Sequence, residues 1–231
     1  MKGPVANTPE HMRFAVLASD SVLFTIRGSE LLVRLIDVDR PPHFVNIPGL
    51  PGGLLHPKET AGEAAVRHLT GKARVDVSKA YIEQLYTFSN VDRDPRGRVV
   101  AVAYLALVPW ETLSTEEQAD MKESYWRPVS RARKLAYDHD EILDAALKRL
   151  RSRIRYTTLI QKLMPKEFTL TELEQAYESV LGTDLDKRNF RKKILKLEVL
   201  TALPHKRTGG RFRPAQLYRF ASAKVDEIEV L

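Results

Sequence analysis

Residues 50–75 hold the side chains best placed for chemistry, because a glycine-rich turn leads directly into a helical pattern. The turn Pro51-Gly52-Gly53 allows a backbone too close or too twisted for other residues, so a phosphate could approach it. From Glu59 onward, alanines with Val66 and Leu69 recur at helical spacing and give one small apolar face. The stretch predicts a loop and a helix beside a possible anion site, although an ordinary turn and helix start would share this composition.

The same stretch resembles the Nudix box, in which a glycine, a glutamate and an arginine are spaced along a loop and a helix. Four residues fall on that spacing: Gly53, Glu59, Arg67 and Leu69. In an active Nudix hydrolase, three further glutamates on one helix face hold Mg²⁺, a cation that prefers oxygen ligands. This chain has His68, Gly71 and Lys72 at those positions, and the lysine would repel a divalent ion. The resemblance implies a retained pocket with no catalytic residue and no metal site.

A second basic segment, residues 90–98, lies between strand-like runs at 81–88 and 99–108. Its arginines surround a proline and a glycine, which is also the usual composition of a solvated hairpin tip. However, Arg93-Asp-Pro-Arg-Gly-Arg98 followed by a strand containing Tyr-Leu-Ala resembles the matching segment of ADP-ribose-handling Nudix proteins. The two resemblances imply a site for a phosphorylated ligand, formed by Arg40, Gly52, Gly53, Glu59, Arg67, Arg93, Asp94, Arg96, Arg98 and Tyr104.

Composition sets broader limits. The 231 residues are 43% hydrophobic and 29% charged, as in a soluble globular protein with one large or two small domains. Cysteine is absent from the sequence, which excludes disulfides and zinc–thiolate sites. Neither the first residues nor any later run has the apolar length of a signal peptide or a membrane span, so we expect a cytoplasmic protein without membrane contact.

Further strands and one long helix are predicted before residue 156. Three more runs are strand-like: residues 14–26, 31–38 and 125–129. Asp138 followed by Glu141 resembles a capping box, and apolar residues after it keep helical spacing up to a basic end at 148–155. At this helix start we expect His139 to be structural rather than a ligand-binding residue.

From about residue 156 the pattern becomes short helices and a hairpin, the outline of a winged helix-turn-helix. Thr169 and Glu172 give a capping signal before one helix, Gly182 ends it, and a second helix is expected over 187–200. Residues 187–219 contain eleven basic residues and one acidic residue, an excess larger than the +7 charge of the whole chain. Positive charge is therefore concentrated on this unit.

Such charge suits DNA, because a helix-turn-helix places its second helix in the major groove while nearby cations hold phosphates. The alternative is a solvated basic face on a protein-interaction winged helix. The expected DNA-binding residues are Lys187, Arg188, Arg191, Lys192, Lys206, Arg207, Arg211 and Arg213.

The whole order resembles the Nudix-related transcriptional regulators of NAD metabolism, the NrtR family. Besides the box, its marks include Arg93-Asp-Pro-Arg-Gly97, Tyr137-Asp-His139 and Phe190-Arg-Lys-Lys193. The resemblance implies an α+β fold, with an N-terminal Nudix-like α/β/α sandwich domain followed by a C-terminal winged helix-turn-helix domain. The expected parts are a flexible arm at 1–12, an effector-binding domain at 13–137, a linker helix at 138–155 and a DNA-binding domain at 156–231.

The family resemblance also implies a homodimeric repressor of NAD biosynthesis or salvage genes, bound to a palindromic operator in double-stranded DNA. ADP-ribose would enter the Nudix pocket and release the DNA, with no cofactor required. Two alternatives stay open. One is a sugar-responsive Nudix-like regulator, which the arginine-rich loop disfavours. The other is an active Mg²⁺-dependent ADP-ribose pyrophosphatase, in which Glu59 and Glu63 hold a metal by another route.

Overall fold

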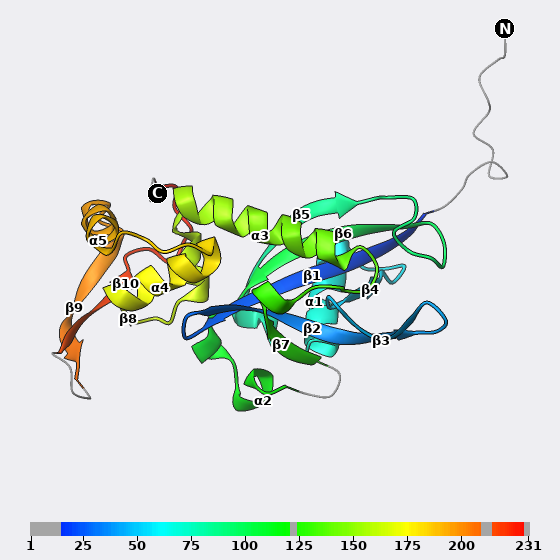
Figure 1. Ribbon diagram of the computed structural model, residues 1–231, viewed down its shortest axis with the longest axis horizontal. Coiled ribbons are helices and arrows are strands. Elements are labelled where there is room, and N and C mark those ends of the chain that lie inside the picture. Colours follow the sequence, from blue (N-terminus) through cyan, green and yellow to red (C-terminus); the bar gives the residue numbers. More distant parts are fainter. Residues whose placement is uncertain (1–14, 121–123, 209–213, 229–231) are drawn as a thin grey trace, which may run out of the picture.

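The computed structural model describes residues 15–120, 124–208 and 214–228, so the expected arm at 1–12 and two expected DNA-binding residues, Arg211 and Arg213, lie outside the described residues. A larger part built on one sheet precedes a smaller part with two helices and its own sheet (Figure 1). Along the described chain, no helix combines the length and apolar character needed to cross a membrane.

The larger part contains a sheet with strand order β3-β2-β1-β6-β5, in which β1 and β6 run parallel. Strands β4 and β7 pair with β1 and β2 respectively. Its elements are β1 (Val16–Arg27), β2 (Glu30–Arg40), β3 (Phe44–Gly49), β4 (Gly52–Leu54), α1 (Ala61–Gly71), β5 (Tyr81–Phe88), β6 (Val99–Leu107), α2 (Thr115–Gln118), β7 (Ser124–Pro128) and α3 (His139–Tyr156).

Helices α1 and α3 cover opposite faces of this sheet. Successive side chains of a strand point to opposite faces, and β1 shows this at two adjacent residues. Leu23 shares a buried cluster with Leu69 of α1, whereas Phe24 shares another with Leu150 of α3. The predicted α/β/α sandwich is therefore confirmed.

The smaller part is a winged helix, as predicted. Its elements are β8 (Phe168–Thr169), α4 (Leu170–Leu181), α5 (Lys187–Lys196), β9 (Leu200–Arg207) and β10 (Ala215–Phe220), with strand order β8-β10-β9. Thr169 and Glu172 form the expected capping box, and Gly182 ends α4 at a left-handed φ of 73°. Helix α5 stops at Lys196, earlier than expected, because Glu198 at φ 55° turns the chain into β9.

The expected capping box at the start of α3 is wrong. Asp138 occupies the N-cap position but makes no side-chain hydrogen bond to the helix. Its carboxylate instead accepts hydrogen bonds from Arg93, at 2.8 Å from Nε and 2.7 Å from Nη2. A bidentate pair between two ions gains energy and geometric specificity from its two parallel bonds, so a distant arginine displaces the local cap.

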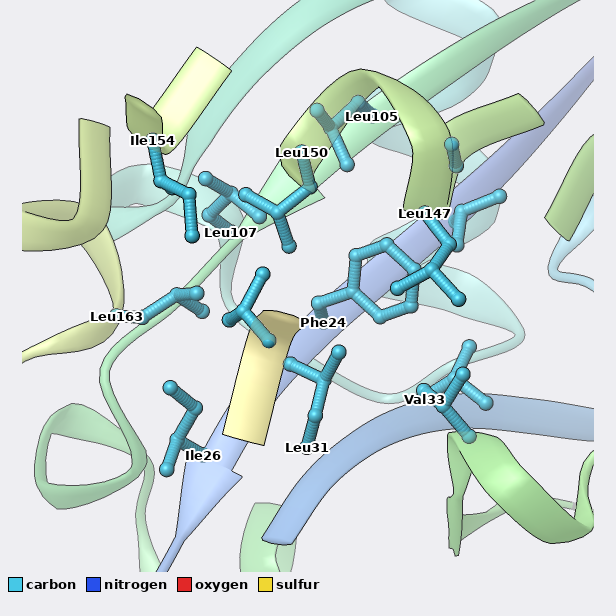
Figure 2. Packing of buried hydrophobic residues seen from close by; sticks show 14 of the residues in the cluster. Phe24, Ile26, Leu31, Val33, Leu105, Leu107, Leu147, Leu150, Ile154 and Leu163 are labelled. Carbon is cyan, nitrogen blue, oxygen red and sulfur yellow. The ribbon is translucent and has the colours of Figure 1, made fainter. Parts of the chain in front are cut away.

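Apolar residues from both parts form one continuous buried cluster. Figure 2 shows its centre, where Phe24 and Ile26 of β1 lie below Leu150 and Ile154 of α3 in this view. Leu163, from the 3-10 helix Thr158–Leu163 that follows α3, lies at the left of the view, between Ile154 and Ile26. The cluster continues through Phe168 into α4, so the winged helix shares its core with the sheet.

We predict that Ile154→Ala weakens both parts together. Ile154 is fully buried in the shared cluster, and truncating a buried isoleucine costs about 2–5 kcal/mol. Scanning calorimetry should show a single unfolding transition that moves to lower temperature as a unit, whereas the control Arg155→Ala, at an exposed position of the same helix, should barely move it. Two resolved transitions, with only one displaced, would contradict a shared core.

Candidate functional site

A cavity of about 590 Å³ opens beside the glycine-rich turn, within the usual size range of small-molecule sites. It receives side chains from β1, the end of β2, the end of α1, the loop before β6 and the segment before α3. Six expected ligand residues line it: Arg40, Gly52, Gly53, Arg93, Asp94 and Arg96. Four others are not among the lining residues: Glu59, Arg67, Arg98 and Tyr104.

Those four residues have other contacts. The Glu59 carboxylate accepts hydrogen bonds from Arg67, and these lower the pKa of Glu59 to about 2. Arg67 also donates to the Leu54 carbonyl oxygen at 3.1 Å, so this pair ties α1 to β4. Arg98 donates to the carbonyl oxygens of Ser89 and Asn90, and the hydroxyl of Tyr104 faces Gly62 of α1.

A buried charge cluster closes the inner end of the cavity. The Arg93 guanidinium reaches Asp20 of β1 at 3.0 Å and Asp138 at 2.7 Å, with all three side chains at most 9% exposed. Burial opposes the charge on Arg93, but the hydrogen bonds and charges of Asp138 and Asp20 outweigh it and raise the pKa of Arg93. The cluster joins the central strand, the arginine-rich loop and α3.

His139 fits the structural role expected from its place at the helix start. Its Nδ1 accepts a hydrogen bond from the Leu50 backbone N–H at 2.9 Å, and its Nε2 lies 3.8 Å from Asp20. Burial lowers the pKa of His139, so the imidazole is neutral near pH 7. Gly49 permits this packing, because a Cβ there would meet His139 Nδ1 at 3.1 Å and Val38 at 2.5 Å.

The outer cavity carries four cations: Arg40, Lys72, Arg74 and Arg96. Arg96 is paired with Asp94 at 2.7 Å and lies over the Tyr137 ring, 5.5 Å from its centre. The Lys72 ammonium donates to the Gly52 carbonyl oxygen. Partial desolvation of the ammonium beside the turn and the nearby Arg40 lower the pKa of Lys72, while Asp20 opposes this, although the side chain remains accessible from the cavity. Asp37, Asp39 and Asp94 also line the cavity, so the groups available to an anion are the cations without a carboxylate partner among the described residues, Lys72 among them.

The box positions do not fit the Mg²⁺ that the Nudix fold implies. His68 is 4% exposed, and burial with the neighbouring Lys72 lowers its pKa to about 4. Lys72 points an ammonium into the cavity, and Gly71 offers no side chain. Across the described ranges, no three acidic, histidine or cysteine residues gather as metal ligands. A site of this kind favours oxyanions over a hard cation.

Sequence reasoning missed several cavity residues. Tyr137 lies at φ 56° and packs on Phe44, with ring centres 4.3 Å apart, so it presents an aromatic surface to the cavity. The Tyr137-Asp-His139 motif was recognisable but did not show which way the ring points. Lys72 was noted only as a lost metal ligand, and Asp20 gave no signal because it lies inside a predicted strand and belongs to no recognised motif.

The basic surface of the winged helix is partly neutralised by α4. Glu174, 4% exposed, lies 3.5 Å from Lys187 and 3.3 Å from Arg191. Arg207 of β9 is paired with Glu172. By contrast, Arg188, Lys192 and Lys206 are exposed and have no carboxylate partner within the part of the chain that the structure describes. These three are the expected DNA-binding residues with charge most available to phosphate.

The fold and the cavity together define a Nudix-like ligand-binding domain joined to a winged helix. The sequence profile of the NrtR DNA-binding winged helix domain matches residues 160–220. The ADPR responsive transcriptional repressor NtrR of Acinetobacter baylyi is 34% identical over 213 residues, covering 91% of this chain and 84% of that protein. The chain therefore belongs to the NrtR family of transcriptional regulators.

Two solved structures support the arrangement. Shewanella oneidensis NrtR complexed with a 27mer DNA matches with a TM-score of 0.77 and 33% identity, covering 88% of this chain and 93% of that one. The Nudix domain of the same protein complexed with ADP ribose matches with a TM-score of 0.53 and 32% identity, covering 63% of this chain and 94% of that one. The family resemblance drawn from the sequence is confirmed.

We predict that Arg93→Met lowers the free energy of unfolding by about 3–5 kcal/mol, since it leaves two buried carboxylates without their cation. Arg98→Met, in the same loop but at an exposed position, is the matched control and should change it by under about 1 kcal/mol. Urea denaturation at pH 7 measures both. Equal effects of the two variants would contradict a central role for Arg93.

We also predict a loss of stability as the pH falls from 7 to 5. The pKa of His68 is about 4 in the folded chain against about 6.5 when unfolded, so only the unfolded state gains a proton in this window. His68 alone then destabilises the fold by about 2 kcal/mol at pH 5. In urea titrations at both pH values, His68→Gln should reduce this dependence. If His68→Gln leaves the pH dependence of stability unchanged, a buried neutral imidazole at His68 is contradicted. His139, whose pKa is also lowered, accounts for the pH dependence that remains in the variant.

Proposed function

We propose that this chain is a DNA-binding repressor of NAD biosynthesis or salvage genes that senses ADP-ribose and does not hydrolyse it. The observation that carries the proposal is a cation-lined Nudix-like cavity connected through α3 to a winged helix with an exposed basic helix. The proposed repressor is a cytoplasmic homodimer on a palindromic operator, because a two-fold operator requires a two-fold protein.

The cavity supports ADP-ribose by its size and its chemistry. Its volume of about 590 Å³ suits a ligand of this class. Lys72, Arg40 and Arg96 offer charge for a diphosphate, while Tyr137 offers a ring on which a purine can stack. The related Nudix domain whose structure was solved with ADP ribose makes the same ligand the first to test. A plain sugar would offer no anionic group to the Lys72 ammonium, whose hydrogen bond within the described chain goes to a neutral carbonyl oxygen.

The winged helix supports DNA through α5. Phe190 and Ile194 anchor this helix in the core, so the opposite face carries Arg188 and Lys192 outward. The related NrtR solved with a 27mer DNA is similar over both parts of the chain. We propose that α5 enters the major groove, with Lys187, Arg191, Lys206 and Arg207 beside it. Phosphate contacts from these cations would make binding strongly salt-dependent.

Coupling between the two sites is proposed to run along α3. Asp138 at its start is bound to Arg93 at the inner end of the cavity, and Ile154 near its end lies in the core shared with the winged helix. ADP-ribose lowers DNA affinity only if it binds better to the arrangement that binds DNA poorly, and such couplings are typically about 1–3 kcal/mol. A displaced Arg93 loop would move the start of α3.

The proposed lack of hydrolysis rests on the box itself. Phosphoryl hydrolysis by Nudix enzymes needs carboxylate-held divalent cations to neutralise the diphosphate. Here the Glu59 carboxylate is paired with Arg67, and neither residue is among those that line the cavity. Glu63 is also engaged, because its carboxylate accepts hydrogen bonds from Thr60 at the start of α1. The route by which Glu59 and Glu63 would jointly hold a metal is therefore disfavoured.

The test is a gel shift of the full chain on DNA from upstream of its own operon, at fixed salt, with and without ADP-ribose. We expect a specific shift that ADP-ribose releases, and no AMP when ADP-ribose and Mg²⁺ are incubated with the protein. A specific shift that ignores ADP-ribose would discard the effector and favour a sugar or another nucleotide. Release of AMP would favour the pyrophosphatase.

A matched pair of variants controls the DNA assignment. The double variant Arg188→Ala and Lys192→Ala should weaken the shift at least about tenfold and reduce its salt dependence by roughly two counterions per protomer, or about four for the dimer. Lys79→Ala, an exposed lysine of the first part, should leave the shift unchanged. A protein-interaction winged helix would give no specific shift with any of these proteins.

A further inference from the structure

Lys72 stands where Nudix hydrolases have a metal-binding glutamate, and it makes contacts of its own at the cavity wall. Lys72 directly follows α1 and its backbone N–H bonds to the His68 carbonyl oxygen, so His68 and Lys72 lie on one helix face. The side chain reaches β4, where its ammonium meets the Gly52 carbonyl oxygen. The ammonium therefore lies under the glycine-rich turn, at the wall of the cavity.

The turn at Gly52 and Gly53 lies in close contact with Lys72. A Cβ on Gly53 would lie 3.0 Å from Lys72 Nζ and 3.0 Å from His68 Cε1. A Cβ on Gly52 would lie 2.0 Å from Asp20 Oδ1. Both glycines are thus needed for the close approach of the turn to α1 and β1, and this approach fixes the place of the ammonium.

The hydrogen-bonding capacity of Lys72 is only partly used. An ammonium carries three donors, and within the described chain its hydrogen bond goes to one neutral carbonyl oxygen. Partial desolvation of the ammonium and the charges of Arg40, Arg67 and Arg96 lower the pKa of Lys72, while Asp20 opposes them. A bound oxyanion would relieve this repulsion and accept the remaining donors.

His68 is buried beside Lys72 and carries no charge near pH 7. Its Nε2 is buried and has no hydrogen-bond partner within the described chain, and its lowered pKa of about 4 keeps it neutral near pH 7. The imidazole fills the space between α1 and the turn at a position where a hydrolase would present a carboxylate. Lys72 is therefore the charged group that this helix face presents to the cavity.

We propose that the Lys72 ammonium replaces the divalent cation of Nudix hydrolases, contacting the diphosphate of the effector directly so that effector binding needs no metal. This inference rests on the proposed function, because it names the group that recognises ADP-ribose. A diphosphate diester carries two negative charges, which Lys72 and one cavity arginine can balance. The same exchange of a carboxylate for an ammonium converts a cation site into an anion site.

The test is calorimetric titration of ADP-ribose into the full chain, once in EDTA and once in Mg²⁺. We expect the two dissociation constants to agree within about twofold. Lys72→Met should weaken binding at least about tenfold in both buffers, and Lys72→Arg should retain part of the affinity. The control Lys58→Met, at an exposed position before α1, should bind as the unaltered chain does.

A charge-reversed variant gives a second readout. Lys72→Glu should bind ADP-ribose weakly both in EDTA and with added Mn²⁺, since one carboxylate cannot replace the three that hold a divalent cation in a Nudix hydrolase. Circular dichroism melting confirms that each variant is folded. The comparison of buffers on the unaltered chain needs no variant and stands even if one fails to fold.

The outcomes separate the two claims. Binding by the unaltered chain that requires Mg²⁺ would overturn the role of Lys72 and leave the effector assignment intact, as would Lys72→Met binding ADP-ribose as tightly as the unaltered chain. Binding in neither buffer would overturn both the effector assignment and this inference.

Discussion

The site depends on one buried arginine shared by two carboxylates. Arg93 holds Asp20 in the central strand and Asp138 at the start of α3, and the three side chains have almost no contact with solvent. Desolvating such charges is expensive, and only close geometry with satisfied hydrogen bonds recovers the cost. The loop before β6, the sheet and α3 are consequently held in one arrangement, which also sets the inner end of the cavity.

This constraint extends to the winged helix because α3 is not a free linker. Its buried face is shared with the sheet along its whole length, from Ile142 to Ile154. Its end is tied to the C-terminal segment, since Ile228 donates its N–H to the Tyr156 carbonyl oxygen and Asp226 accepts one from Thr158. A displacement at Asp138 must therefore be accommodated by repacking of both parts. Closely packed interfaces respond by moving between discrete arrangements rather than by continuous deformation.

Local patterns predicted the elements well and the contacts poorly. Strand-like runs predicted β5 and β6 nearly residue for residue, and the Thr169 capping box and Gly182 terminus were confirmed, because such signals need only neighbouring residues. The Asp138 box failed because its competitor, Arg93, lies 45 residues away. In the same way, local patterns did not show that Glu59 forms an ion pair with Arg67. They also did not show that Glu174 is paired with Lys187 and Arg191 of α5. Side-chain direction and charge pairing depend on tertiary contacts, which local sequence patterns do not contain.

Replacing a carboxylate by Lys72 suits a sensor better than an enzyme on energetic grounds. An enzyme must bind the transition state more tightly than the substrate, and metal ions do this by stabilising charge that develops during the reaction. A diphosphate already carries its charge in the ground state, so an ammonium fixed beside the turn binds it without favouring its cleavage. Such binding energy is available to shift a conformational equilibrium, provided that the cavity geometry differs between the two states. Because Arg93 ties the cavity wall to α3, the proposed DNA-bound and effector-bound states can differ in this way.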